Sequence, residues 1–342
     1  MDLPVPGVQP RLPAPRGALS SALLDCLGGA RATPPEPPPA QGGDPLDDED
    51  LQLALYVCYE LHYRGFLGVD PCWEWDPSLL GFRRVLERRF EQALARDVPV
   101  PEAVPAEGLP TALRALTNRA GPPLSAFLEQ EATLAQFLEF VIHRSAYQRK
   151  EADPHSWALP RLEGAAKAAL VEIQADEYGG GRPERMHQEL FAATMAALGL
   201  DPAYGAYLDA IPATTLATVN LVSLFGLHRR WRGALVGHLA AFEMTSTEPN
   251  RRFGNGLRRL GFGAEATTFY DEHVQADSVH EQVAAHDLAG GLARQEPALV
   301  SDILFGAEAC LHLDDRAAGH LLGAWTRGES SLRWVEGPPG AG

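Results

Sequence analysis

Cysteines and strand-forming patterns are scarce in this chain of 342 residues. Its four cysteines, Cys26, Cys58, Cys72 and Cys310, include no Cys-x-x-Cys pair. This spacing indicates reduced thiols rather than a disulfide framework or a thiolate zinc site. Sustained alternation of apolar and polar residues is nearly absent, as are Asn-Gly turns between β-branched runs. A mainly β fold is therefore not expected.

Positive charge is also in short supply. Lys and Arg number 29 against 45 Asp and Glu, which gives a formal net charge of -16. Such an excess of negative charge disfavours non-specific binding to nucleic acid or to an anionic membrane surface. No uncharged stretch reaches the roughly 18 to 20 residues of a membrane span, and the N-terminus lacks the order of a signal peptide. We expect a cytoplasmic protein with no nucleic-acid or membrane partner.

The motifs of several large enzyme classes are missing. The chain has no Gly-x-Ser-x-Gly nucleophile elbow, no Walker A lysine loop and no His-Glu-x-x-His zinc motif. Gly254-Asn-Gly256 does not predict a phosphate loop, because no strand precedes it and the third glycine is misplaced. Any chemistry must therefore come from another arrangement of side chains.

Composition divides the chain into two tails and a helical body. Residues 1–47 hold 11 of the 28 prolines. We expect a disordered tail there, because this segment has too little apolar surface to offset its ordering entropy. At most a helical turn is expected over 20–27. Residues 331–342 are rich in Gly and Pro and are expected to form a flexible C-terminal tail. Between them, an N-terminal helical extension over 48–105 is expected to pack on a main domain over 106–330.

The body has the periodicity of helices almost throughout. In a helix predicted over 79–96, Phe82, Leu86, Phe90 and Leu94 recur at four-residue intervals. Further helices are predicted over 48–63, 113–116, 125–146, 157–176, 185–198, 202–210, 214–224, 230–243, 250–260, 263–289, 297–310 and 313–328. The fold class expected is an all-α bundle.

The stretch from Phe269 to His280 is the most informative part of the sequence. His273, Asp277 and His280 stand at positions i, i+4 and i+7, which fall within about 40° of one another on an α-helix. Imidazole and carboxylate ligands without a thiolate favour iron or manganese over a structural zinc. The alternative, a solvated helix face, shares this spacing. Three ligands from one helix cannot close a metal site, so others must come from elsewhere.

Candidates for those ligands occur upstream. Glu243 lies in an otherwise apolar helical segment, where a carboxylate is costly to bury unless it is paired or bound to a metal. Glu177 and His187 flank the triplet Gly179–Gly181, which allows the backbone to bend. Glu184 competes with Glu177, because Glu-x-x-His is the spacing of compact di-iron bundles. Glu177, His187 and Glu243 bring the candidates to six when they are added to the three on the helix of His273. Six is the number of ligands in such a dinuclear site.

Other polar residues carry weaker predictions. Tyr270 lies three residues before His273 and could form a hydrogen bond beside the ligands, although a packed core aromatic is favoured. His143 and His155 are expected at the surface or at helix ends. His238 lies about 140° around the helix from Glu243 and is not expected to share a ligand role with it.

These residues make the chain resemble the haem-oxygenase-like diiron oxidases and oxygenases, in particular the iron-containing redox enzymes. The resemblance rests on Asp176-Glu-Tyr-Gly-Gly-Gly followed by His187, on Gly-His-Leu-Ala-Ala-Phe-Glu243, and on Glu-His273-x3-Asp277-x2-His280. It extends from about Leu53 to Leu322.

The resemblance implies a haem-oxygenase-like helical bundle of about seven core helices, with extra N-terminal helices, two Fe ions and no haem. It implies as metal ligands Glu177, His187, Glu243, His273, Asp277 and His280, with Glu151 as a candidate extra ligand. We assign Glu177, His187 and Glu243 mainly to one iron and the remaining three to the other. One carboxylate is expected to bridge.

On this basis we expect an O2-dependent oxidoreductase that acts on a small polar molecule bearing an amine or a carboxylate. An electron donor is a further expected partner, and a homodimer is the default oligomer. The alternative is a non-catalytic helical protein that binds a metal or a small molecule on the same scaffold. Haem degradation would need a proximal histidine, for which His62 is the candidate, and six competing ligands disfavour it.

Overall fold

The computed structural model of the chain describes residues 9–39, 42–99 and 102–333, apart from the side chains of 276–279. Within these ranges the regular structure is helical and contains no strand, so the predicted all-α class is confirmed. The α-helices are α1 (Ala18–Leu27), α2 (Glu49–Glu60), α3 (Pro77–Asp97), α4 (Leu109–Thr117), α5 (Leu124–Gln130), α6 (Leu134–Gln148), α7 (Asp153–Ser156), α8 (Gly164–Glu177), α9 (His187–Ala197), α10 (Ala213–Leu227), α11 (Arg232–Arg259), α12 (Ala264–Gln282), α13 (Gly290–Gln295) and α14 (Val300–Thr326).

Short 3₁₀ turns and one π-helical segment connect these helices. The 3₁₀ turns are η1 (Pro71–Trp75), η2 (Ala106–Gly108), η3 (Leu159–Arg161), η4 (Gly179–Gly181), η5 (Pro183–Arg185), η6 (Leu208–Ala210), η7 (Arg229–Trp231) and η9 (Pro297–Leu299). The π-helical segment η8 (Val283–Ala289) directly follows α12.

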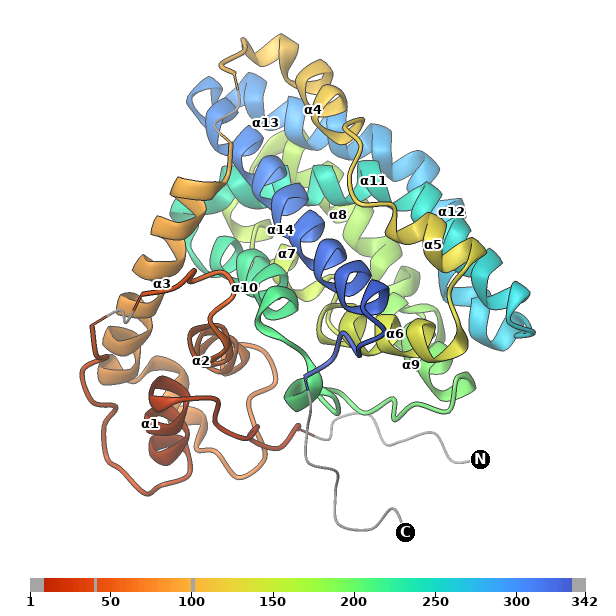
Figure 1. Cartoon of the computed structure of the whole chain (residues 1–342). Helices are drawn as coiled ribbons and strands as arrows, with labels where there is room; N and C mark the ends of the chain where they lie inside the picture. Colours follow the sequence, from red (N-terminus) through yellow and green to blue (C-terminus); the bar gives the residue numbers. More distant parts are fainter. Residues whose placement is uncertain (1–8, 40–41, 100–101, 334–342) are drawn as a thin grey trace.

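Helix α11 packs against both α12 and α14 (Figure 1). Two glycines allow the backbones of α11 and α14 to touch where they cross. A Cβ on Gly237 would lie 1.8 Å from the carbonyl oxygen of Ile303, and a Cβ on Gly306 would lie 1.9 Å from that of Ala234. Any larger residue at either position would force the helices apart. This close crossing determines how deep within the bundle Glu243 of α11 lies.

Several predicted helix boundaries are wrong. Apart from residues 230–231 of η7 and the final residue 260, ranges 230–243 and 250–260 belong to the single helix α11, which continues through Pro249. Proline removes one helical hydrogen bond, but the packing of α11 on its neighbours outweighs that loss. Ranges 297–310 and 313–328 likewise merge into one helix, α14, which begins after the turn η9 and ends at Thr326.

The predicted helix over 125–146 is broken in two. Thr133 caps the start of α6 by accepting from the backbone N–H of Gln136, whose side chain accepts from the N–H of Thr133. Range 202–210 contains only the 3₁₀ turn η6.

The three N-terminal helices gather at the lower left of Figure 1. Within the tail expected to be disordered, α1 buries Leu19, Leu23 and Leu27, and Asp50 of α2 accepts from the backbone N–H of Leu19 at 2.7 Å. This packing corrects the expectation for that part of the tail, because leucines four residues apart give α1 an apolar face. Residues 1–8 and 40–41 of the same tail lie outside the described residues, and the domain division near 105 stays a prediction.

The expected C-terminal tail also begins with packed residues. The hydroxyl of Ser331 donates to Glu139 at 2.6 Å, and Ser331 is buried. The expected flexibility therefore does not apply to Ser331. Residues 334–342 lie outside the described part of the chain.

A buried ion pair joins α2 to the segment that follows α6. Lys150 Nζ lies 2.8 Å from Glu60 Oε2, and the two side chains are 1% and 0% exposed. The Tyr204 hydroxyl donates to the same oxygen at 2.7 Å. The ammonium group also lies 4.4 Å from the ring centre of Tyr63. Because Glu151 is the next residue after Lys150, this pair holds the backbone beside a predicted metal ligand.

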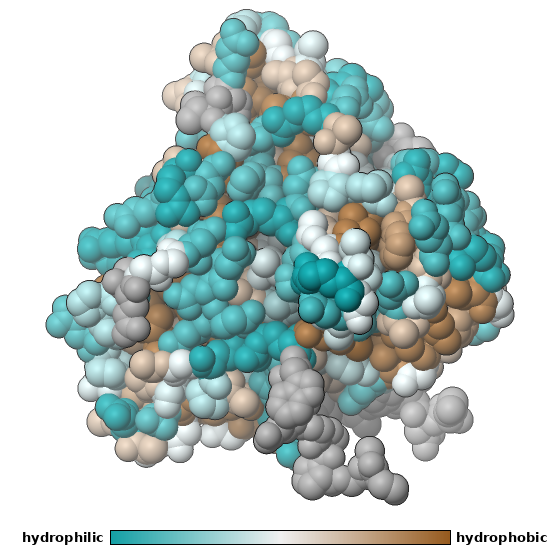
Figure 2. Space-filling model, viewed as in Figure 1, coloured by the Kyte–Doolittle hydropathy of each residue, from teal (hydrophilic) through white to brown (hydrophobic). Residues whose placement is uncertain are grey.

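None of the described helices combines the length and the apolar character that crossing a bilayer requires. The face of the molecule seen in Figure 2 is mostly hydrophilic, with apolar residues gathered toward its lower right.

Replacing Lys150 with Met tests the buried pair. Glu60 would stay buried without its cationic partner, and breaking such a pair costs roughly 3–5 kcal/mol. Urea unfolding followed by circular dichroism measures this loss. Lys167→Met, at the only other lysine in the chain, is the matched control, with an expected change below about 0.5 kcal/mol. Equal unfolding midpoints for the two variants would contradict the prediction.

Candidate metal centre

The predicted ligands come from five separate parts of the bundle. Glu151 follows α6, Glu177 ends α8, His187 begins α9, Glu243 lies within α11, and α12 carries His273, Asp277 and His280. All except Asp277, whose side chain lies outside the described residues, are buried, with exposures between 1% and 7%.

The described side chains form two groups that share Glu177. One group contains Glu151, Glu177, His187 and His273, and the other contains Glu177, Glu243 and His280; in each, one ligand atom per residue lies within 4.8 Å of the others. Glu177 is thus the one described residue common to both groups.

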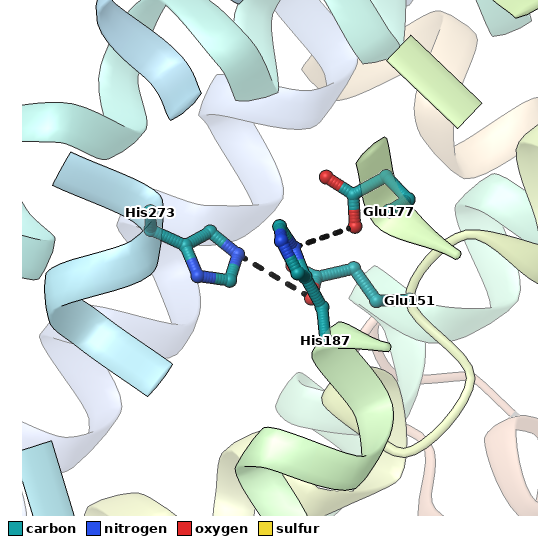
Figure 3. Close-up of side chains that lie close together, drawn as sticks. All are labelled: Glu151, Glu177, His187 and His273. Atoms are coloured by element: carbon teal, nitrogen blue, oxygen red, sulfur yellow. Dashed lines mark ion pairs between the residues drawn. The ribbon is translucent and has the colours of Figure 1, made fainter. Parts of the chain in front are cut away.

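Figure 3 shows how the side chains of the first group face one another. Nδ1 of His187 lies 2.9 Å from Oε2 of Glu177. Nε2 of His273 lies 3.5 Å from Oε2 of Glu151. In the second group, Nδ1 of His280 lies 3.6 Å from Oε2 of Glu243.

The structure divides these residues differently from the partition expected from the sequence. His273 lies with His187, whereas Glu243 lies with His280. The reason is the rise of the helix: seven residues span about 10 Å along the axis. His273 and His280 share a face of α12 but reach different groups.

The glycine triplet performs the turn that was predicted for it. Gly179 has φ +66° and Gly180 φ +60°, values that L-residues with a side chain rarely adopt. A Cβ on Gly179 would lie 2.7 Å from the backbone nitrogen of Met186. This turn brings the end of α8 to the start of α9 and so places Glu177 beside His187. Glu184 is exposed and belongs to neither group, which favours Glu177 over Glu184.

Two imidazoles are oriented by hydrogen bonds on the ring nitrogen that faces away from the group. Nδ1 of His273 lies 2.8 Å from the carbonyl oxygen of Phe269; it must be the donor there, which leaves the Nε2 lone pair for a metal. Nε2 of His280 lies 2.9 Å from Oδ2 of Asp176. Such partners fix the tautomer and orientation of metal-binding histidines. No role for Asp176 was predicted from the sequence.

The charges of the cluster compensate one another. Burial by itself would raise the pKa of Glu177, but the adjacent imidazoles, His187 foremost, lower it to about 2. Burial opposes protonation of His280, yet the carboxylate of Glu243 raises its pKa to about 9. Without a metal, buried imidazolium groups therefore balance buried carboxylates.

The donor set fits a metal pair. Glu177 Oε2, His187 Nδ1 and His280 Nδ1 are buried, and their close polar neighbours are the oppositely charged groups of the cluster, none of them aligned for a regular hydrogen bond. Three carboxylates and three imidazoles without a thiolate suit iron or manganese.

A cavity of about 580 Å³ borders the cluster. Its lining includes Glu151, Glu177, Glu243 and His273, together with aromatic side chains of α6, α11 and α12. Tyr270 is among these aromatic residues. It packs edge-on against Phe253 and Phe269, and its buried hydroxyl has no partner among the described residues. This packing favours a core aromatic over a hydrogen bonder to the ligands.

Three further histidines line the cavity: His143, His155 and His238. The expectation of surface positions for His143 and His155 is wrong. His143 is 4% and His155 2% exposed. Nε2 of His155 lies 3.1 Å from Nδ1 of His238. Burial lowers the pKa of His155 to about 4 and that of His143 to about 3, so both are neutral near pH 7. Helical spacing gave no sign of this burial.

Residues 138–315, just over half of the chain, match the family of iron-containing redox enzymes. The chain belongs to this family. The matched stretch contains all seven predicted metal ligands. Membership confirms the resemblance found in the sequence and supports an oxidoreductase.

Two individual proteins are similar to this chain. A nitrosourea synthase from Streptomyces achromogenes subsp. streptozoticus is 24% identical over 192 residues, which cover 55% of this chain and 41% of that protein. The chain thus spans about two fifths of that relative. A domain of unknown function with a heme oxygenase-like fold from Shewanella denitrificans OS217 gives a TM-score of 0.49 at 14% identity, covering 73% of this chain and 98% of the other.

Asp176→Asn tests the hydrogen bond to His280. The amide keeps a similar shape but loses the charge that supports the imidazole, and we expect Fe(II) affinity to fall roughly 10- to 100-fold. Anaerobic titration against a competing chelator measures it. Asp287→Asn, at an exposed position of η8, should keep wild-type affinity. Unchanged affinity in Asp176→Asn would show that the contact does not support the site.

The raised pKa of His280, about 9, predicts a pH dependence of metal binding. A metal binds only the deprotonated imidazole, so below pH 9 it must displace a proton. Apparent Fe(II) affinity should therefore rise with pH between about 6 and 9, by up to about tenfold per unit for this one proton. Titrations at several pH values measure the slope, and a flat profile would contradict the prediction.

Proposed function

We propose that this protein is a non-haem diiron oxidase or oxygenase that uses O2 to oxidise a small polar, amine- or carboxylate-bearing molecule in the cytoplasm. The observation that carries this proposal is the pair of buried ligand groups that share Glu177 and border one cavity. Membership in the iron-containing redox enzymes supports it. The similarity to a nitrosourea synthase supports a nitrogen-bearing substrate.

In this proposal each group of side chains holds one Fe ion. Glu151, His187 and His273 would hold the first, Glu243 and His280 would hold the second with Asp277, and Glu177 would serve both. When bound, a ferrous pair supplies electrons for the reduction of O2. The chain itself holds the imidazoles in one tautomer and limits water around the site through the aromatic walls of the cavity.

Haem is not part of the proposal. His62, the residue considered as a proximal ligand, has both ring nitrogens engaged. Its Nδ1 lies 3.2 Å from Glu74 Oε1 and its Nε2 lies 2.5 Å from an Arg83 guanidinium nitrogen. An external electron donor and a homodimer stay predictions.

Anaerobic Fe(II) titration followed by mixing with O2 tests the proposal. We expect two irons per chain and a visible absorption band that develops when O2 is added. His273→Ala and Asp277→Ala should abolish iron binding, because each removes a ligand from a different group in the proposed assignment. His286→Ala, at an exposed histidine of η8, should still bind two irons.

Zero or one iron per wild-type chain would overturn the diiron proposal, as would a folded His273→Ala variant that keeps two. Two irons without any O2 consumption would instead support the alternative, a non-catalytic metal-binding protein on the same scaffold.

A further inference from the structure

The cavity beside the metal centre contains two further charged side chains that the proposed metal site does not use. Arg144 comes from α6 and Asp314 from α14, and both line the cavity. Each is partly buried. They lie on different helices, so only the folded bundle brings them to one cavity.

Arg144 forms no ion pair and no hydrogen bond with any described residue, and its guanidinium carbon lies 5.6 Å from the ring centre of Phe140. The other arginine of the cavity lining behaves differently. Arg119 donates to both carboxylate oxygens of Glu308, at 2.6 and 2.7 Å. A partly buried guanidinium without an anion is unfavourable. Arg144 therefore offers its donors to a molecule that enters the cavity.

Asp314 is the complementary group. It forms no ion pair or hydrogen bond with the described part of the chain, and burial raises its pKa while the charge of Arg144 opposes that rise. The two groups thus interact across the cavity lining but are too far apart to form an ion pair. His143, next to Arg144, lines the same cavity and is neutral near pH 7. It therefore adds no charge that would compete with Arg144 for an anion.

We propose that Arg144 and Asp314 bind the carboxylate and the ammonium group of a zwitterionic substrate, an α-amino acid or a close derivative. The planar guanidinium can donate two parallel hydrogen bonds to a carboxylate, and the Asp314 carboxylate accepts from the ammonium group. The rest of the molecule extends toward Glu151, Glu177 and Glu243. A cavity of about 580 Å³ is in the range that holds a small-molecule ligand.

This inference rests on the proposed function only for the fate of the substrate, because recognition by Arg144 and Asp314 needs no metal. Binding can therefore be tested apart from turnover. It narrows the substrate class from amine- or carboxylate-bearing molecules to molecules that carry both groups.

The test is calorimetric binding of the standard L-amino acids to the full chain, both metal-free and loaded anaerobically with Fe(II). For each amino acid that binds, the amine lacking its carboxylate and the acid lacking its amino group are measured as well. We expect at least one amino acid to bind. Both of its analogues should bind at least about tenfold more weakly.

Two variants make the assignment specific. Arg144→Gln should bind the amino acid about tenfold more weakly and should no longer distinguish it from the amine. Asp314→Asn should no longer distinguish it from the acid. Arg84→Gln, at an exposed arginine of α3, should bind like the wild type. Iron content should stay the same in all three variants.

The proposal is overturned if no L-amino acid binds, or if Arg144→Gln and Asp314→Asn bind as tightly as the wild type. It is also overturned if both variants still discriminate against the analogues. Iron stoichiometry separates the two proposals. Amino acid binding that depends on both residues in a chain that takes up no iron would sink the diiron assignment and keep this one.

Discussion

The burial of Glu177 together with two other carboxylates and three imidazoles is the constraint on which the rest of this structure depends. Charged groups leave water only when opposite charges or a metal replace the lost hydration. The metal-free arrangement achieves this by imidazolium–carboxylate pairing, since the pKa of Glu177 falls and that of His280 rises. A metal pair would satisfy the same oxygens and nitrogens while displacing protons.

Several features of the surrounding bundle hold that cluster in place. Gly237 and Gly306 let α11 and α14 cross in backbone contact, which sets the position of Glu243. The Lys150–Glu60 pair anchors the backbone beside Glu151 from the N-terminal helices. The N-terminal extension thus contributes to the geometry of the candidate centre, although it supplies no ligand among the described residues.

Two sets of polar side chains line the cavity. Near the cluster, carboxylates and imidazoles face the space; elsewhere the lining offers Arg144 and Asp314 without ion partners among the described residues. In the proposed enzyme the metal centre would react with O2, and Arg144 and Asp314 would orient the substrate.

The sequence by itself determined the all-α class, the family and six of the residues that the bundle brings together. The spacing of His273, Asp277 and His280 and the glycine triplet after Glu177 are local patterns, and helical geometry makes local patterns readable. Only the tertiary structure decided that His273 and His280 belong to different groups, that Asp176 supports His280 from 104 positions away, and that Arg144 and Asp314 meet in one cavity. These relations join distant parts of the chain, and they depend on how whole helices cross, which side-chain periodicity along one helix does not encode.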